Sequence, residues 1–531
     1  MDRKLSVWGW GYADQHPDRS GREALGGQVA AMLGFSGLEA VDPPELDTLD
    51  IPEPRVDVPK ALSDIARVDR YNRAIHTRGK AYPDVIRGLR GDYANAPDFT
   101  AHPQNEEDVA RVLEIAAARD LAVVPFGGGT SVVGGVECAI GDRNGVLSLD
   151  LRGIDSVLEI DDTSRLARIG AGATGPVLSD QLAKHGMTLR HYPQSFEFST
   201  LGGWIATRAG GHFATLYTHI DEMVASARMI TPTGIWASRP LPGSGAGPSP
   251  DRLVLGSEGT LGVITEAWMR VRPIPRWRGA ATVEFPEWSA AVNATREIAQ
   301  SGMYPSNCRL LDKREARLHG VSMSGRHLLL LGFESAHHEV GAALAATRAV
   351  AESHGGECPE GSKMRDRGDQ ASGGQAGQWK QAFFNAPYLA STLATLGVLA
   401  DTFETACTWR AFDAMHAEVV ATVREVLKRT GGAGFVACRF THVYPDGPAP
   451  YYTFVTPARR GSEIEQWMEI KSAASEVLMK HGATITHHHA VGRTHRPWYD
   501  QQRPDPFARA LGAAKKELDP SGILNPGVLI D

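Results

Sequence analysis

The fold of this chain is decided by the stretch Leu121-Ala122-Val123-Val124-Pro125-Phe126-Gly127-Gly128-Gly129-Thr130-Ser131. The apolar residues before Phe126 predict a short buried strand, and the three glycines predict a turn without side chains. Consecutive glycines let backbone N–H groups face a bound diphosphate, and Thr130 and Ser131 add hydroxyl donors. The pattern is neither Gly-x-Gly-x-x-Gly opening a helix nor a Walker A loop. A triple glycine on its own is usually only a tight turn, so the rest of the chain has to decide.

Two further glycine-rich stretches follow the first one. They run from Pro193 to Gly211 and from Gly256 to Glu266. Three segments that expose their backbone suit an elongated ligand lying beneath several loops. A lone turn does not explain the whole set.

The composition bounds the class of protein. A chain of 531 residues, 42% hydrophobic and 22% charged, is an ordinary globular protein that is too long for a single core. Its net charge of −7 gives no general attraction to nucleic acid or anionic lipid, so no nucleic-acid partner is expected. Five scattered cysteines argue against a disulfide framework. No apolar run is long enough to span a bilayer and no signal peptide is apparent, so a cytoplasmic location is predicted.

Strands and long helices alternate irregularly, so the predicted fold class is α+β. The predicted strands include residues 145–151, 165–169 and 221–230, and the predicted helices include residues 288–300 and 409–430. This mixture indicates a cofactor domain followed by a separate α+β substrate domain.

Four segments are expected along the chain. They are an N-terminal helical segment over 1–90, a cofactor domain over 91–275, a substrate (cap) domain over 276–475, and a C-terminal segment over 476–531 that completes the active site. Residues 361–378, rich in glycine and glutamine, predict a mobile loop or lid. The aromatic residues Trp8, Trp10 and Tyr12 are expected to pack against another domain.

The three glycine-rich segments, in this order, resemble the vanillyl-alcohol oxidase (PCMH-type) superfamily of FAD enzymes. The resemblance implies a two-subdomain FAD-binding domain whose first loop holds the diphosphate and whose later segments line the ribityl chain and flavin. Some members attach the flavin through a His or Cys near the first loop. Thr130 and Ser131 stand there in this chain, so non-covalent FAD is expected.

The expected cofactor contacts come from all three segments. They are Pro125, Phe126, Gly127, Gly128, Gly129, Thr130 and Ser131 from the first, Pro193, Gln194, Ser195, Phe198, Ser199, Ala206, Thr207, Arg208 and Ala209 from the second, and Glu258, Gly259, Thr260, Gly262, Val263 and Ile264 from the third.

Within the superfamily, the chain resembles the alkyldihydroxyacetonephosphate synthase family over nearly its whole length. The motifs that carry this resemblance are Trp-Gly-Trp-Gly-Tyr at 8–12, Cys-Arg-Leu-Leu-Asp at 308–312, Thr-Phe-Glu-Thr-Ala at 402–406, Cys438-Arg439, and His487-His488-His489. The family exchanges the acyl group of acyl-dihydroxyacetone phosphate for a fatty alcohol in ether lipid synthesis. The oxidised flavin traps the substrate carbon at N5 during this reaction. The implied partners are small-molecule lipid substrates, and a homodimer with peripheral membrane contact is a hypothesis.

The resemblance also assigns the chemistry. It places the tyrosine base at Tyr451 and makes His487, His488, His489 and Arg309 catalytic. From the residues alone, Tyr451 is better explained as a core aromatic and Arg309 as a surface arginine. A short strand is expected to lead into the histidines, which would alternate faces if extended. With no carboxylate pattern beside them, a metal is less favoured, and no metal is predicted.

The competing interpretation is a flavin-dependent oxidase or dehydrogenase of an alcohol or 2-hydroxy acid. Such dehydrogenases carry a metal-binding carboxylate where this chain has the histidine triplet. Two departures from the synthase pattern keep the substrate open: Ala390 replaces a substrate-binding arginine, and Ala490 replaces a glycine. A third hypothesis is a flavin-binding relative without activity.

Overall fold

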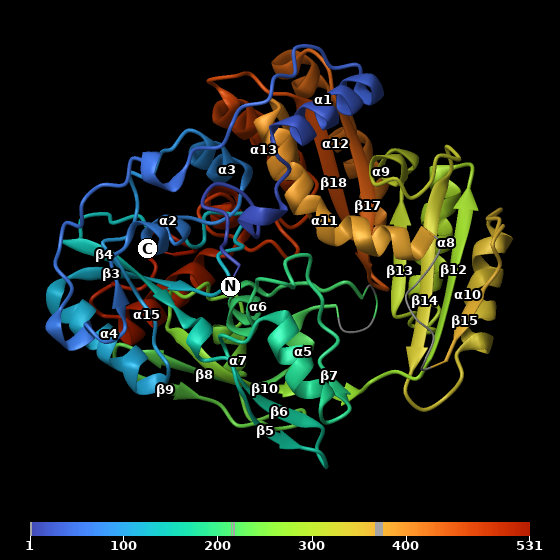
Figure 1. Cartoon of the computed structure of the whole chain (residues 1–531). Helices are drawn as coiled ribbons and strands as arrows, with labels where there is room; N and C mark the ends of the chain where they lie inside the picture. Colours follow the sequence, from blue (N-terminus) through green and yellow to red (C-terminus); the bar gives the residue numbers. More distant parts are fainter. Residues whose placement is uncertain (1–2, 214, 216–217, 367–374, 531) are drawn as a thin grey trace.

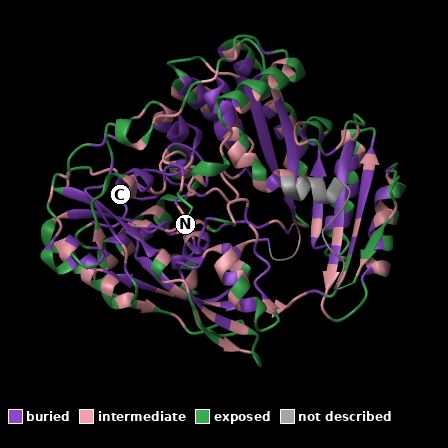
Figure 2. Ribbon diagram, viewed as in Figure 1, coloured by how far each residue is buried: buried purple, intermediate pink, exposed green. Residues whose placement is uncertain are grey.

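The computed structural model describes residues 3–213, 215, 218–366 and 375–530 (Figure 1). Three main sheets organise these residues: a four-stranded sheet, a five-stranded sheet and a seven-stranded sheet. Helices lie against all of them, so the predicted α+β class is confirmed. Buried residues run along the strands, and exposed residues gather on loops and outer helices (Figure 2). No helix among the described residues is long and apolar enough to cross a membrane.

The four-stranded sheet carries the glycine-rich loop. Its order is β1 (Ala66–Arg67), β2 (Phe99–Ala101), β4 (Gly145–Asp150) and β3 (Leu121–Phe126), with β3 and β2 both parallel to β4. The preceding helix α4 (Glu106–Arg119) begins at Asn105, whose side chain accepts a hydrogen bond from the N–H of Asp108. The predicted strand before the glycines is therefore confirmed, and it ends at Phe126.

The five-stranded sheet forms the second part of the cofactor region. Its order is β5 (Val157–Asp161), β6 (Leu166–Gly170), β10 (Val263–Arg270), β8 (Val224–Thr231) and β9 (Gly234–Ala237). The helices and short strands that accompany it are α5 (Gly175–Ala183), α6 (Leu201–Thr207), α7 (Asp251–Val254), β7 (Met187–Thr188) and β11 (Arg272–Pro273). Two sheets thus form the two expected subdomains.

The seven-stranded sheet is antiparallel throughout and forms the cap. Its order is β15 (Lys363–Arg365), β12 (Trp277–Phe285), β14 (His327–Ser335), β13 (Asn307–Leu311), β17 (Phe435–Val443), β18 (Pro448–Pro457) and β16 (Val398–Glu404). Its helices are α8 (Trp288–Gln300), α9 (Lys313–Leu318), α10 (Gly341–Ser353), α11 (Gln375–Thr395), α12 (Trp409–Gly431) and α13 (Glu463–Lys480). The predicted helices over 288–300 and 409–430 are confirmed.

One predicted loop is corrected. Residues 361–378 were expected to form a loop or lid, yet β15 pairs with β12 inside this range and α11 begins at Gln375. Residues 367–374 lie outside the described residues. Composition did not identify β15 because the pairing with β12 is a tertiary contact.

The chain ends tie the parts together. The N-terminal helices are α1 (Arg19–Leu33), α2 (Arg70–Ile75) and α3 (Tyr82–Leu89), and the C-terminal ones are α14 (Arg496–Gln502) and α15 (Asp505–Leu518). The N–H of Val123 donates to the carbonyl of Ile523, and the N–H of Asn525 donates back to the carbonyl of Val123. The C-terminus therefore returns to the strand that precedes the glycine loop.

The N-terminal aromatic motif packs between the cap and the cofactor region. The N–H of Trp10 donates to the Ser391 hydroxyl on α11 at 3.1 Å, and the N–H of Tyr12 donates to the Tyr388 hydroxyl at 3.2 Å. The rings of Trp10 and Tyr12 both meet Phe198 edge-on. The expected contact with another domain is confirmed. The division at residues 90, 275 and 475 stays a prediction; α13 continues unbroken across 475, and β1 joins the cofactor sheet from within the first segment.

Candidate active site

The glycine loop has backbone N–H groups that find no acceptor within the part of the chain that the structure describes. Among the hydrogen bonds of the described residues, none has the N–H of Gly127, Gly128, Gly129 or Thr130 as its donor. Backbone N–H groups normally find a partner when they are sheltered from water, so a row of open donors suits an anionic ligand. The hydroxyl of Ser131 has a different task, since it accepts the N–H of Gly135 at 2.9 Å and shapes the loop.

The three glycine-rich segments converge. A Cβ on Gly128 would lie 1.9 Å from the carbonyl oxygen of Phe198, and one on Gly127 would lie 2.3 Å from Oγ1 of Thr200. A Cβ on Gly259, in the third segment, would lie 2.9 Å from Cγ of Pro125. The glycines are therefore required by close packing of one segment on the next, and we call the three segments together the cradle.

Several other predicted cofactor side chains hold the segments in shape. Ser199 accepts the indole N–H of Trp204 at 2.7 Å, and the hydroxyls of Thr207 and Thr260 donate to carbonyls within their own segments. Gln194 donates to the carbonyl of Phe383 at 2.8 Å.

The remaining predicted contacts also sit in the converging segments. Ser195, Ala206, Ala209 and Pro193 lie in the second, where Arg208 binds Asp221. At the end of the third, Gly262 is packed against Met229, while Val263 and Ile264 belong to β10 with their side chains in the hydrophobic core. A contact of these two residues with the cofactor stays a prediction.

A buried glutamate of the cap holds the histidine triplet. Glu404, at the end of β16, accepts the backbone N–H of His487 at 2.6 Å, of His488 at 3.2 Å and of His489 at 3.0 Å. The hydroxyl of Thr486 donates to the same carboxylate at 2.6 Å. Burial acts to raise the pKa of Glu404, but His489, His487 and the donors outweigh it and hold that pKa below its usual value.

This arrangement corrects two expectations. The triplet lies in a bend and not at the end of a strand, because its three N–H groups converge on one carboxylate and cannot point in alternate directions. A carboxylate does stand beside the histidines, although no local pattern announced it. The sequence signal for Glu404 is weak, because Asp401 in the same strand is an equally good acidic candidate.

A second buried glutamate holds the residues that follow. Glu258, in the third glycine-rich segment, accepts the N–H of Val491 at 2.9 Å and of Gly492 at 2.8 Å. Burial raises the pKa of Glu258 to about 7, and the two N–H donors act against the rise. Its carboxylate therefore ties the cofactor region to the triplet segment.

Tyr451 lies in β18 beneath a cation. The Arg439 guanidinium, on the neighbouring strand β17, is 3.8 Å from the centre of the Tyr451 ring. The Tyr451 hydroxyl is 2.9 Å from Oγ1 of Thr402 on β16. The ring centres of His488 and His489 are 6.0 and 5.5 Å away. The structure thus brings Tyr451 together with two members of the triplet.

The third histidine belongs to a chain of neutral rings. His219 Nδ1 faces the carbonyl of Arg208, so that nitrogen carries the proton and Nε2 accepts. His487 Nε2 lies 3.1 Å from His219 Nε2 and 2.7 Å from the Tyr444 hydroxyl, and His487 Nδ1 lies 2.9 Å from His488 Nδ1. Burial lowers the pKa of both His487 and His488 well below the usual range. The rings are therefore uncharged at neutral pH.

Sequence reasoning missed His219, Tyr444 and His442 as members of this cluster. His442 is the last residue but one of β17 and donates from Nε2 to the carbonyl of Gly211 at 2.9 Å. Ring nitrogens of His442, His487 and His488 all lie within 4.8 Å of one another, which is close enough for a metal ion. Hydrogen bonds already join His487 and His488, so the cluster does not require one. The absence of a metal stays a prediction that elemental analysis of the holoenzyme tests.

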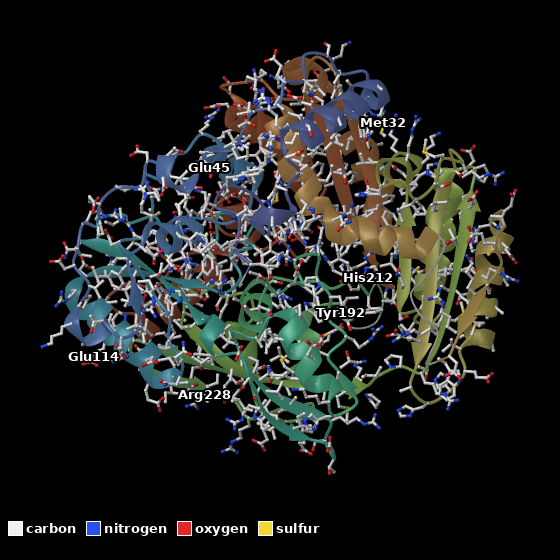
Figure 3. The ribbon with its side chains drawn as sticks, in the orientation of Figure 1. Met32, Glu45, Glu114, Tyr192, His212 and Arg228 are labelled. Carbon is white, nitrogen blue, oxygen red and sulfur yellow. The ribbon has the colours of Figure 1, made fainter. Side chains whose placement is uncertain are left out.

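Arg309 faces the cofactor region from β13. It is buried, and its Nη2 donates to the carbonyl of His212 at 3.1 Å. His212 is labelled in Figure 3. Burial lowers its pKa to about 9, so the guanidinium keeps its charge at neutral pH. It is a buried cation and not the surface arginine of the alternative interpretation. Ala390 lies on α11, and its uncharged side chain does not replace the arginine that the synthase pattern has at this position.

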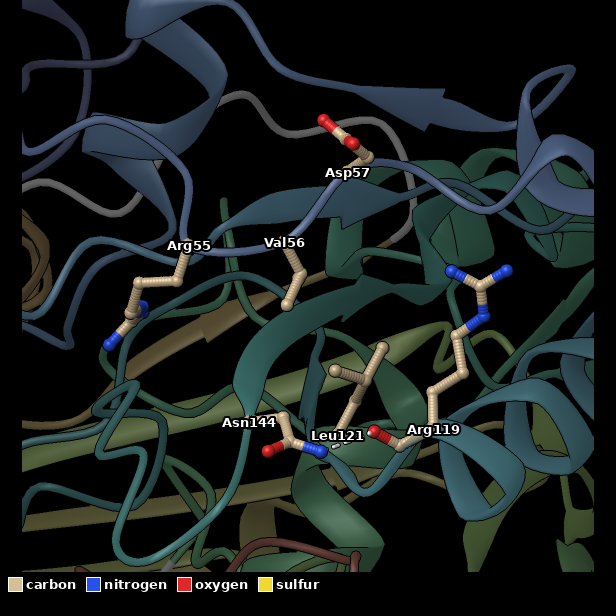
Figure 4. A pocket seen from close by; sticks show the side chains of 6 residues that line it. All are labelled: Arg55, Val56, Asp57, Arg119, Leu121 and Asn144. Atoms are coloured by element: carbon tan, nitrogen blue, oxygen red, sulfur yellow. Dashed lines mark hydrogen bonds between the residues drawn. The ribbon is translucent and has the colours of Figure 1, made fainter.

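A surface hollow of about 510 Å³ lies apart from these residues (Figure 4). Its walls are Arg55, Val56, Asp57, Arg119, Leu121 and Asn144. Arg119 ends α4, where carbonyl groups disfavour an anion, and Asn144 donates to the Arg119 carbonyl. None of the predicted site residues lines it.

Two family profiles and several known proteins match this chain. The profile described as FAD binding domain matches residues 97–238, and the one described as FAD linked oxidases, C-terminal domain matches residues 274–529. Alkyldihydroxyacetonephosphate synthases of Trypanosoma brucei brucei and Dictyostelium discoideum are each 30% identical over 88% of this chain, and cover 78% and 79% of their own lengths. A solved alkyldihydroxyacetonephosphate synthase superposes with a TM-score of 0.80 at 26% identity, covering 98% of this chain and 99% of its own.

The cradle gives the first prediction. Gly128→Ala forces a methyl group into the Phe198 carbonyl, so FAD affinity should fall by about 100-fold, for a cost of about 3 kcal/mol. Gly243→Ala, in a surface loop with nothing within 4 Å, is the control. Flavin released from purified protein measures the effect. Equal FAD content in both variants would contradict it.

Glu404 gives a pH-dependent prediction. Because its folded pKa lies below the usual value of about 4, the charge stabilises the fold at neutral pH, and this contribution is lost as the pH falls below about 4. Glu404→Gln should lower the free energy of unfolding by about 3 kcal/mol at pH 7. The difference from the wild type should shrink in acid. Denaturant unfolding at several pH values checks this, and a pH-independent difference would contradict it.

Ala490 gives a prediction with the opposite sign. Its φ is 72°, in the left-handed region that disfavours a Cβ. Ala490→Gly should therefore raise the free energy of unfolding by about 1 kcal/mol. Ala421→Gly, on the exposed face of α12, should lower it by about 1 kcal/mol. Thermal unfolding compares the two, and a loss of stability in both would show that Ala490 is unstrained.

Proposed function

Since the chain belongs to the alkyldihydroxyacetonephosphate synthase family and uses FAD, we propose that it exchanges the acyl group of an acyl-dihydroxyacetone phosphate for a fatty alcohol. The enzyme is thus an FAD-dependent alkyl transferase of ether lipid synthesis. The observation that carries the proposal is Tyr451, held under the Arg439 guanidinium and beside the histidine triplet. The competing oxidase or dehydrogenase function has less support from the relatives.

The FAD site is assigned to the cradle of three glycine-rich segments. The open N–H groups of Gly127 to Thr130 suit the diphosphate. Bound there, FAD supplies an electron-poor ring that accepts the substrate carbon. Thr130 and Ser131 offer no attachment point of the His or Cys kind, so we propose non-covalent binding.

Tyr451 is assigned as the base that removes the C1 proton. A phenol serves as a base only when its oxygen is ionised, which a nearby cation favours. The Thr402 hydroxyl holds the phenol oxygen in place at 2.9 Å. The proton taken from C1 would then reside on the Tyr451 oxygen until the leaving or entering oxygen needs it.

The neutral histidines and Arg309 complete the assignment. Because burial keeps His487 and His488 uncharged, each ring offers one N–H donor and one acceptor nitrogen for hydrogen bonds. His489, held by Glu404, lies on the edge of the Tyr451 ring. Arg309 is a buried cation suited to a phosphate or to developing negative charge.

Binding partners beyond the substrates stay hypotheses. A fatty alcohol partitions into membranes, and Met32 on α1 and Leu389 on α11 are exposed apolar side chains. Peripheral membrane contact would be contradicted if the protein does not sediment with liposomes. Light scattering tests the homodimer.

The proposed reaction is tested without an electron acceptor. Palmitoyl-dihydroxyacetone phosphate mixed anaerobically with the holoenzyme should bleach the visible flavin band and release palmitate, and hexadecanol should restore the colour. Tyr451→Phe should slow palmitate release by about 100-fold or more. Tyr452→Phe, which loses hydroxyl contacts with His416 and Cys438 on the opposite face of the strand, is the control. Bleaching by an alcohol or hydroxy acid, reversed only by oxygen or a dye, would instead show an oxidase or dehydrogenase.

A further inference from the structure

The geometry points to Arg439 as the positioning residue that sets the ionisation of Tyr451, with buried Glu315 as the counter-charge that tempers it. This inference rests on the proposed role of Tyr451 as the base. Neither Arg439 nor Glu315 belongs to the residues assigned above to substrate, cofactor or the reacting atoms. They act through Tyr451.

Strand register creates the contact. Arg439 and Tyr451 are directly opposite each other in the antiparallel pair β17 and β18. Side chains that share a face at such a position are close neighbours. Here the guanidinium carbon of Arg439 lies over the Tyr451 ring, 3.8 Å from its centre. Arg439 is 3% exposed and Tyr451 is 4% exposed, so little water screens the interaction.

Other charged groups around Tyr451 do not replace Arg439. Burial acts first to raise the pKa of Tyr451, and Asp401 and Glu404 on β16 act in the same direction. Arg439 and the hydrogen bond with Thr402 act against this rise, but the pKa of Tyr451 stays above its usual value, so the cation limits the rise without reversing it. From the triplet, burial lowers the pKa of His488 and His489, so these rings add no charge at neutral pH.

One further cation approaches from α13. Lys471 Nζ donates to the carbonyl of Thr402 at 2.6 Å, and its own pKa is lowered by burial. It therefore serves the backbone of β16, while Arg439 is the cation in contact with the ring.

Glu315 supplies the counter-charge from α9. Its Oε1 forms an ion pair with Nη1 of Arg439 and lies 3.2 Å from Nε2 of His319. Burial acts to raise the pKa of Glu315, but Arg439 and His319 outweigh it and lower the pKa to about 2. The carboxylate is therefore ionised. It fixes the guanidinium over the ring and offsets part of the positive charge.

The two partners should act on Tyr451 with opposite signs. Arg439→Met removes the cation, so phenolate becomes harder to form and the pH dependence of turnover should move up by about one unit or more. Glu315→Gln keeps a hydrogen-bond acceptor for Arg439 but removes the negative charge. The pH dependence should then move down. A merely structural role predicts slower turnover in both variants and no movement of the profile in opposite directions.

The experiment compares turnover over a pH series in the FAD-loaded wild type, Arg439→Met, Arg439→Lys and Glu315→Gln. Arg429→Met, on the surface of α12 and paired with Glu469, is the control and should leave the profile unchanged. Arg439→Lys keeps the positive charge and should leave the profile near that of the wild type. If Arg439→Met does not fold, Arg439→Gln removes the charge in its place, and Glu315→Gln gives the opposite sign. Shifts in one common direction, or none, would overturn the inference.

A spectroscopic readout separates this inference from the proposed function. Each variant is titrated by ultraviolet absorbance, and the titration of the same variant carrying Tyr451→Phe is subtracted. The difference reports the ionisation of Tyr451 alone and needs no substrate. A lower midpoint in Glu315→Gln than in the wild type supports the inference even if the lipid substrates prove wrong. An unchanged midpoint contradicts it even if the exchange reaction is observed.

Discussion

The active site depends on two buried glutamates that accept hydrogen bonds from one short backbone segment, residues 487–492. Glu404 of the cap accepts the N–H groups of the three histidines, and Glu258 of the cofactor region accepts those of Val491 and Gly492. Hydrogen bonds to a buried carboxylate are strong, and a buried carboxylate left without donors is costly. Neither glutamate can therefore be satisfied unless cap and cofactor region close on the same segment.

This constraint explains why groups far apart in sequence meet. The cap sheet brings Tyr451, Arg439 and Arg309, and the glycine segments bring the open N–H groups that suit the FAD diphosphate. Between them the triplet segment places uncharged histidines. The positive charge of the site is therefore concentrated in arginines, while the proton-handling groups stay neutral until the reaction requires otherwise.

The sequence predicted the local structure well and the tertiary contacts poorly. The strand over residues 121–126, the helices of the cap and the α+β class follow from periodicity and turn residues, which act over short distances. The resemblance supplied Tyr451 and the triplet.

The hydrogen bonds of Glu404 and Glu258 to residues 487–492 could not be predicted from the sequence. Glu404 lies 83 residues from His487, and Glu258 lies 233 residues from Val491. For the same reason the triplet was expected in an extended strand, and β15 was hidden inside a polar stretch. The left-handed φ of Ala490 could not be predicted either. At a non-glycine residue such a φ follows from closure of the whole segment and not from local preference.

We propose that this site exchanges an acyl group for an alkyl group without net redox change. The most direct test follows the oxygen of the incoming alcohol. With ¹⁸O-labelled hexadecanol and palmitoyl-dihydroxyacetone phosphate under anaerobic conditions, the account predicts that the label appears in the ether product, that palmitate is unlabelled, and that the flavin is oxidised at the end. Unlabelled lipid, or label found in an aldehyde together with reduced flavin, would contradict it.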